Sequence, residues 1–174
     1  MRKGKPAKPR SWSLAALVLL SITLAERAPA QAATSLTQHN VSLNTALALA
    51  QEARASCKRD GFDVSVVVID RTGQLVVVLK SDTAALHNVE LARRKAYTAR
   101  TFRMTSLEWS QLLIARPELV GLKDLPDVIA LGGGVPIMLG EEPIGAIGVS
   151  GTTSQQADEA CAKTAVGGFG RSTP

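Results

Sequence analysis

Apolar residues recur at helical spacing in four parts of the chain and form short unbroken runs in five others. The helical spacing predicts helices at about 42–59, 88–100, 105–116 and 153–165. The β-branched and aliphatic runs predict strands at 64–69, 75–79, 128–131, 135–139 and 144–149. Strands in runs, with helices before, between and after them, indicate an α+β domain with a mainly antiparallel sheet.

Local signals support these boundaries. Polar residues suited to N-caps precede the four predicted helices, namely Ser42, Asn88, Thr105 and Thr153. Thr105 is followed three residues later by Glu108, as in a capping box. The sequence 70–73 joins the first two strands as a hairpin. Both strands of that hairpin are apolar at nearly every position, which predicts helices on both faces of the sheet.

Residues 1–30 have the parts of a secretory signal peptide. Five basic residues lie between Arg2 and Arg10, and an uncharged apolar run of about 12 residues follows at 14–25. That run is shorter than the roughly 20 residues that a membrane-spanning helix needs, so it predicts a signal rather than an anchor. Small residues with the A-x-A pattern place the cleavage near Ala30 or Ala32. The chain is therefore expected to be exported, to the periplasm or the medium.

The remainder has the size and charge of one ordinary domain. Residues 31–41 are polar, contain His39 and are expected to form a flexible tail before a single domain at 42–170. The first 30 residues hold six of the 20 basic and one of the 15 acidic side chains, which leaves 14 of each after cleavage. A balanced charge gives no indication of binding to nucleic acid or to a membrane surface.

The chain has two cysteines, Cys57 and Cys161, near the two ends of this domain. In an oxidising compartment an even number of cysteines suggests a disulfide. Neither belongs to a C-x-x-C motif, which argues against a zinc site.

The motifs that usually carry catalysis are absent from the sequence. Glycines at 132–134 and at 145, 148 and 151 do not form G-x-G-x-x-G before a helix or a P-loop. The sequence around Ser150 does not fit G-x-S-x-G, and no carboxylate pair stands out at helical spacing. We therefore assign no catalytic residues, and the spacing of Gly145 and Gly148 on one strand predicts close approach of other elements to both faces of the sheet.

A single histidine lies beside a basic helix. His87 precedes a helix that carries Arg93, Arg94, Lys95 and Arg100. An imidazole next to several cations suits a haem, because the imidazole coordinates iron while the cations meet the propionates. A solvated basic face with a surface histidine explains the same residues, since cations are also favoured late in a helix.

Four segments, in this order, resemble the GlcG/HbpS proteins, whose fold is shared with the carboxy-terminal domain of PduO. They are 68–73 (VIDRTG), 94–99 (RKAYTA), 132–137 (GGGVPI) and 144–151 (IGAIGVSG), the last followed by Gln156, Asp158 and Glu159. The resemblance implies an α/β/α sandwich on a five-stranded, mainly antiparallel sheet. It also implies haem binding and homo-oligomers, from dimers to octamers made of dimers. In that fold the first and last helices pack side by side, which supports a Cys57–Cys161 disulfide.

The leading hypothesis is thus an exported haem-binding or haem-handling protein that acts as a scavenger, buffer or sensor partner. We predict His87 as the axial metal ligand, because His39 lies in the tail and the cysteines are expected to pair; the alternatives are Tyr97, Thr98 and Met104. The residues expected around the haem are His87, Arg93, Arg94, Lys95, Tyr97 and Thr98. The alternative hypothesis is an enzyme or accessory protein for a small 2-hydroxy acid such as glycolate, with Asp70, Lys95 and Ser150 as its polar groups.

Overall fold

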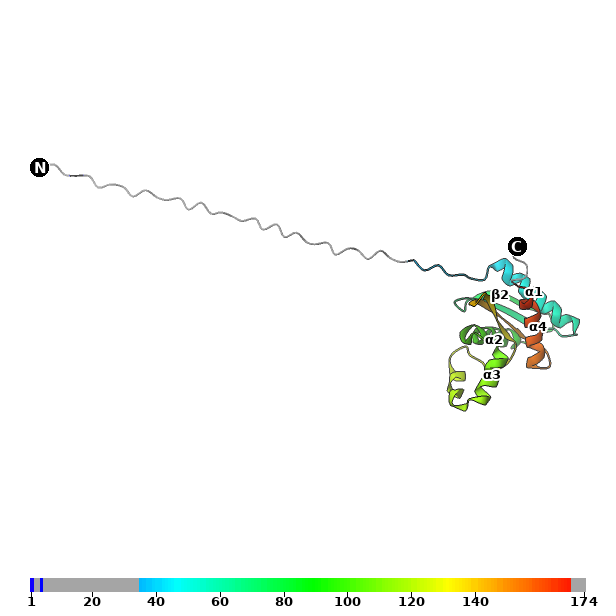
Figure 1. Cartoon of the computed structure of the whole chain (residues 1–174). Coiled ribbons are helices and arrows are strands. Elements are labelled where there is room, and N and C mark those ends of the chain that lie inside the picture. Colours follow the sequence, from blue (N-terminus) through cyan, green and yellow to red (C-terminus); the bar gives the residue numbers. More distant parts are fainter. Residues whose placement is uncertain (2–3, 5–34, 170–174) are drawn as a thin grey trace. The chain divides into compact units, whose positions relative to one another are not determined.

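The computed structural model of the chain describes Met1, Gly4 and residues 35–169 (Figure 1). The chain divides into two units, residues 1–36 and 37–174, and the fold below is that of the second unit. Apart from Met1 and Gly4, the predicted signal peptide lies outside the described residues, as do both predicted cleavage positions. No helix in the described part of the chain is long and apolar enough to span a membrane.

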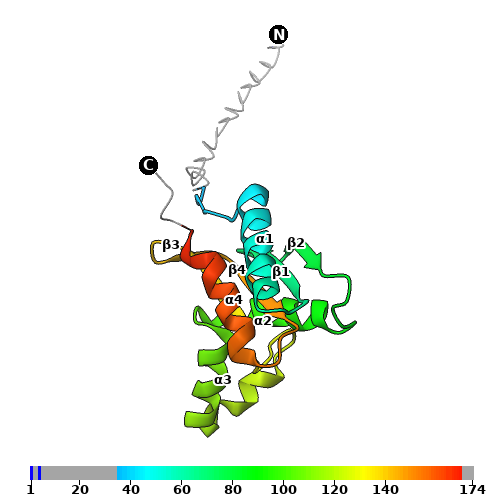
Figure 2. The same ribbon diagram turned by 90° about the vertical axis from the view of Figure 1, so that its right-hand side faces the viewer.

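Four α-helices, one 3-10 helix and four strands make up the described part of this unit. In chain order they are α1 (Leu43–Arg59), β1 (Ser65–Asp70), β2 (Leu75–Lys80), α2 (Asn88–Phe102), α3 (Ser106–Ala115), η1 (Pro117–Asp124), β3 (Gly134–Leu139), β4 (Glu142–Ser150) and α4 (Gln155–Gly167). The strands form one antiparallel sheet in the order β2-β1-β4-β3. Helices α1 and α4 lie side by side over one face, and α2 lies on the other (Figure 2). The predicted α+β class with helices on both faces is confirmed.

The predicted fifth strand at 128–131 does not form, and the sheet in the described residues has four strands. The backbone of this segment is bound by side chains of α2 instead of by a neighbouring strand. Thr98 Oγ1 accepts from Ile129 N at 2.9 Å and donates to Ile129 O at 3.3 Å. Arg94 donates to Val128 O at 2.6 Å. The apolar run correctly predicts that Val128 is buried. The prediction of a strand was wrong, because side chains of α2 rather than another strand bind the backbone of this segment.

The N-caps of the four α-helices agree with the predictions to within one residue. Ser42 caps α1, and Thr105 with Glu108 forms the predicted capping box of α3. Helix α4 is capped by Ser154 rather than Thr153, because the Ser154 side chain accepts from Ala157 N. Asn88 is the first residue of α2 rather than its N-cap, and His87 stands at the cap position without a side-chain hydrogen bond.

Residues 35–41 form neither helix nor strand. Val41 is nonetheless buried, and its backbone N–H donates to Ile144 O at 3.1 Å. His39 Nδ1 lies 2.7 Å from Glu142 Oε2. The segment before α1 thus contacts the β3–β4 hairpin.

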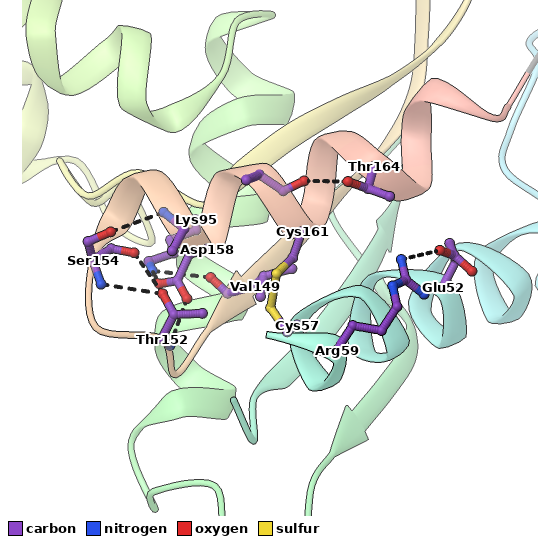
Figure 3. Close-up of a disulfide and its surroundings, with 12 residues drawn as sticks. Glu52, Cys57, Arg59, Lys95, Val149, Thr152, Ser154, Asp158, Cys161 and Thr164 are labelled. Carbon is purple, nitrogen blue, oxygen red and sulfur yellow. Dashed lines mark hydrogen bonds and ion pairs between the residues drawn. A yellow bond between two sulfur atoms is a disulfide. The ribbon is translucent and has the colours of Figure 1, made fainter. Parts of the chain in front are cut away.

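The larger core lies between the sheet and the pair α1 and α4, where aliphatic side chains of all four strands pack. Cys57 on α1 and Cys161 on α4 form a disulfide there, with a Cα–Cα distance of 5.5 Å (Figure 3). The predicted pairing is confirmed. Because the bond joins residues 104 positions apart, it fixes α4 to the start of the domain.

On the other face, α2 presents small side chains to the sheet, with Ala92, Ala96 and Ala99 fully buried. Gly134 and Gly148 are paired across β3 and β4 beneath it. A Cβ atom at Gly134 would overlap the carbonyl oxygen of Lys95, and one at Gly148 would overlap that of Ala92. A Cβ at Gly145 would instead meet Val41 on the opposite face. Gly134 and Gly148 therefore let the backbone of α2 lie directly on the sheet, and the close approach predicted on both faces at Gly145 and Gly148 is confirmed.

Replacing Gly148 tests this contact. We expect Gly148→Ala to lower the free energy of unfolding by about 1 to 3 kcal/mol, since the added methyl group meets backbone rather than a flexible side chain. Gly121→Ala is the matched control, because nothing lies within 4 Å of its Cβ position, and it should change stability by less than about 0.5 kcal/mol. Equal denaturant midpoints for the two variants would show that α2 does not need a glycine there.

Candidate functional site

A cavity of about 390 Å³ lies between the first half of α2, the end of β4 and the start of α4. Its volume is within the usual range for small-molecule sites. The residues that line it come from these elements and from the segment before β3: Ala85, His87, Asn88, Leu91, Lys95, Leu131, Ser150, Gly151, Thr152, Thr153, Ser154, Gln155 and Asp158. The wall contains apolar side chains together with hydroxyl, amide and charged groups.

A buried ion pair joins the two helices at this cavity (Figure 3). Lys95 Nζ lies 2.6 Å from Asp158 Oδ2, and the two side chains are 4% and 6% exposed. Lys95 also donates to Val149 O at 3.1 Å, while Asp158 Oδ1 accepts from Thr152 N at 3.0 Å. Both charges are therefore matched and hydrogen-bonded, which removes most of the cost of burying them.

The positions of the two charges follow from helical spacing. Lys95 shares the buried stripe of α2 with Ala92, Ala96 and Ala99. Asp158 shares the buried stripe of α4 with Cys161, Ala162 and Ala165. A charged residue on an otherwise apolar stripe must find a partner of opposite sign across the core. On α4, however, both Asp158 and Glu159 are buried, so this signal alone does not identify Asp158 as the partner.

Two further polar residues of the cavity wall are almost fully buried. Ser150 is 3% exposed and Asn88 is 6% exposed. Neither side chain has a hydrogen-bond partner within residues 35–169, and both keep their polar atoms in contact with the cavity. Asn88 was considered in the sequence only as a helix cap, so its place in the wall was missed.

His87 is exposed and lines the cavity beside the first turn of α2. The nearby residues of the chain that also line the cavity are Ala85, Asn88 and Leu91. The other histidine, His39, contacts Glu142 near the β3–β4 hairpin and does not line the cavity. Among the described residues no group of three His, Cys, Asp or Glu side chains could hold a metal ion. His87 is the histidine that lines the cavity among the described residues.

The predicted cations have intramolecular partners. Arg93 lies 2.8 Å from Glu90 and 2.6 Å from Asp127, and hydrogen bonding to Glu90, then to Asp127, raises the pKa of Arg93 above its ordinary value. Arg94 donates to Val128 O. Neither arginine lines the cavity, whereas Lys95 does.

Tyr97 and Thr98 also lie outside the cavity wall. Thr98 is fully buried and is hydrogen-bonded to Arg94 O and to Ile129. The Tyr97 ring packs close to Gly73, where a Cβ atom would lie 3.1 Å from it. Of the six residues predicted around a haem, the cavity therefore contains His87 and Lys95.

The residues suggested for a small acid are only partly brought together. Lys95 and Ser150 line the same cavity. Asp70 lies at the opposite end of β1, paired with Gly145, whereas Ser150 is paired with Ser65 at the first residue of that strand. Asp70 accepts hydrogen bonds from Thr72 and Gln74 and shapes the β1–β2 turn.

Comparison with known proteins gives the family. The model of the family described as "Haem degrading protein HbpS-like" matches residues 41–167. The chain belongs to the HbpS-like family. The crystal structure of HbpS is 33% identical, with a TM-score of 0.74, and the similarity covers 79% of this chain and 95% of that one.

Two further proteins agree with this assignment. The crystal structure of the PduOC:heme complex is 28% identical with a TM-score of 0.67, covering 74% of this chain and 94% of that one. A 15.0 kDa protein from the dhaT–dhaS intergenic region of Citrobacter freundii is 30% identical over 131 residues, which is 74% of this chain and 92% of that protein. The resemblance noted in the sequence is confirmed, and the HbpS-like match includes every residue of the cavity wall.

The buried ion pair predicts a large effect for one substitution. Lys95→Met leaves the Asp158 carboxylate buried without its partner and should lower the free energy of unfolding by about 3 to 5 kcal/mol. Lys58→Met, at an exposed lysine paired with Asp63, is the control and should cost at most about 1 kcal/mol. Chemical denaturation measures both, and similar losses in the two variants would contradict a structural role for the pair.

Proposed function

We propose that the protein is an exported haem-binding or haem-handling protein that acts as a scavenger, buffer or sensor partner. The HbpS-like family assignment and the similarity to the PduOC:heme complex support haem as the ligand. The arrangement of residues 1–30 as a signal peptide supports export. Amino-terminal sequencing of the protein recovered from outside the cytoplasm would test export, with a start near Gln31 or Ala33 expected.

The cavity beside His87 is the observation that carries this proposal. The wall contains the His87 imidazole, three apolar residues, Ala85, Leu91 and Leu131, and a larger number of polar residues. A haem also combines both kinds of surface, since its macrocycle is apolar and its two propionates are charged. When bound, it would supply an iron centre whose properties the axial ligand tunes. The residues present therefore fit the group, with His87 as the candidate ligand.

The side chains of Arg93 and Arg94 bind the segment before β3, and we infer that they do not contact the ligand. Arg93 forms an ion pair with Asp127, and Arg94 donates a hydrogen bond to Val128 O. Thr98 Oγ1 accepts a hydrogen bond from Ile129 N. These contacts fix the segment that leads to Leu131, a residue of the cavity wall. We infer that Arg93, Arg94 and Thr98 keep Leu131 in place and do not meet the propionates.

Substitution of His87 tests the axial ligand. His87→Ala should shift the Soret maximum and weaken haem binding, because the iron loses its imidazole. His39→Ala removes an imidazole outside the cavity and should leave the spectrum unchanged. Titration with haem, followed by absorbance, measures both effects. An unaltered spectrum in His87→Ala would mean that another side chain, such as Tyr97, Thr98 or Met104, is the ligand.

We also propose that the protein forms a homo-oligomer, between a dimer and an octamer. Exposed apolar side chains on strand β2, which lies at the edge of the sheet, support this: Leu75 is 55% exposed and Val78 is 42% exposed. An exposed apolar edge strand is normally covered by another chain or protected from one. The mass in solution tests the proposal, and a monomer at micromolar concentration would contradict it.

A second candidate function, binding or conversion of a small 2-hydroxy acid, rests on Lys95 and Ser150 lying in one cavity. Lys95 is neutralised by Asp158, and Asp70 is at the other end of β1, so two of the three suggested polar groups are committed elsewhere. A colourless protein that is stabilised by such acids and gains no Soret band with haem would favour this function.

A further inference from the structure

The polar part of the cavity has hydrogen-bonding groups that the protein itself does not use. Ser150 and Asn88 are more than nine-tenths buried as residues and line the cavity, and their side chains make no hydrogen bond within residues 35–169. The polar atoms of both side chains face the cavity, so water or a ligand can bond to them there. Two of them in one wall therefore point to a polar group of the ligand at this place.

The start of α4 lies in the same wall. The backbone N–H groups of Thr153 and Gln155 have no acceptor among the described residues. The two nearby side-chain acceptors bind other N–H groups: Ser154 accepts from Ala157 N, and Asp158 accepts from Thr152 N. Both residues line the cavity. The amino terminus of a helix carries a partial positive charge that favours an anion.

The charges around these donors favour a carboxylate. Asp158 is the acidic residue of the cavity wall, and its charge is matched by Lys95 at 2.6 Å. The unpaired groups are a hydroxyl, an amide and backbone N–H groups, all of which donate hydrogen bonds. A carboxylate accepts several such bonds at once.

We propose that Asn88, Ser150 and the first turn of α4 form a subsite for a carboxylate of the ligand. The proposal builds on haem binding, in which the carboxylate is a propionate. A free carboxylic acid has the same chemistry and would use the same groups. The sequence predicted that Arg93 and Arg94 bind the propionates, but both have partners elsewhere. In this proposal the subsite binds the carboxylate instead.

The test compares haem with its dimethyl ester, which keeps the iron and the macrocycle but has no carboxylate. Wild-type protein, Ser150→Ala and Asn88→Ala are titrated with both compounds by absorbance. Ser56→Ala on α1, a similarly buried serine outside the cavity wall, is the matched control. Melting temperatures establish that each variant is folded.

The proposal predicts that wild type binds haem more tightly than the ester. Ser150→Ala should weaken haem binding about tenfold, as expected for one hydrogen bond to a charged group, and should leave the ester unaffected. Asn88→Ala should act in the same direction, and Ser56→Ala should change neither. Equal affinity of wild type for haem and ester, or an equal loss for both in Ser150→Ala, would overturn the subsite while haem binding itself stands.

A second arm separates this subsite from the haem proposal. If wild type gives no Soret band with haem, the proposed function fails, and thermal stability is measured with acetate and with acetamide, its neutral counterpart. A rise in melting temperature with acetate alone, lost in Ser150→Ala, would assign the subsite to a free acid. The absence of any shift with acetate would overturn the subsite as well.

Discussion

The direct packing of the α2 backbone on the sheet is the contact on which the rest of the site depends. Gly134 and Gly148 leave room for the carbonyl groups of Lys95 and Ala92, which a Cβ atom would displace. At this depth Lys95 reaches Val149 O on β4 and Asp158 on α4. The same placement brings the start of α2 beside the end of β4, where the cavity forms.

The second wall is held from the opposite face of the sheet. The Cys57–Cys161 disulfide fixes α4 to α1, and the Lys95–Asp158 pair fixes the first turns of α4 to α2 (Figure 3). Helix α4 is thus bonded to α2 through Asp158 and to α1 through Cys161, three residues later. The cavity lies between two elements that the core already holds in place, which gives its wall little freedom to collapse. Preorganised walls of this kind lower the cost of ordering a ligand site on binding.

The sequence predicted the elements well because their periodicity and caps are local, as at Ser42 and Thr105. It failed at 128–131, where the backbone partners are side chains of Arg94 and Thr98, and no local pattern encodes such a partner. Of the residues predicted around a haem, His87 and Lys95 line the cavity. The partner of Lys95, on a helix 63 residues later, required tertiary packing to identify.

The central claim is that the ligand lies in the cavity between α2 and α4. Hydrogen–deuterium exchange of the protein with and without haem, read by mass spectrometry, tests it directly. Slower exchange on haem addition is expected at 85–95 and 150–158, which include most of the cavity wall, with 106–124 unchanged. Protection confined to other segments, with exchange at 85–95 and 150–158 unaltered in haem-saturated protein, would contradict the account.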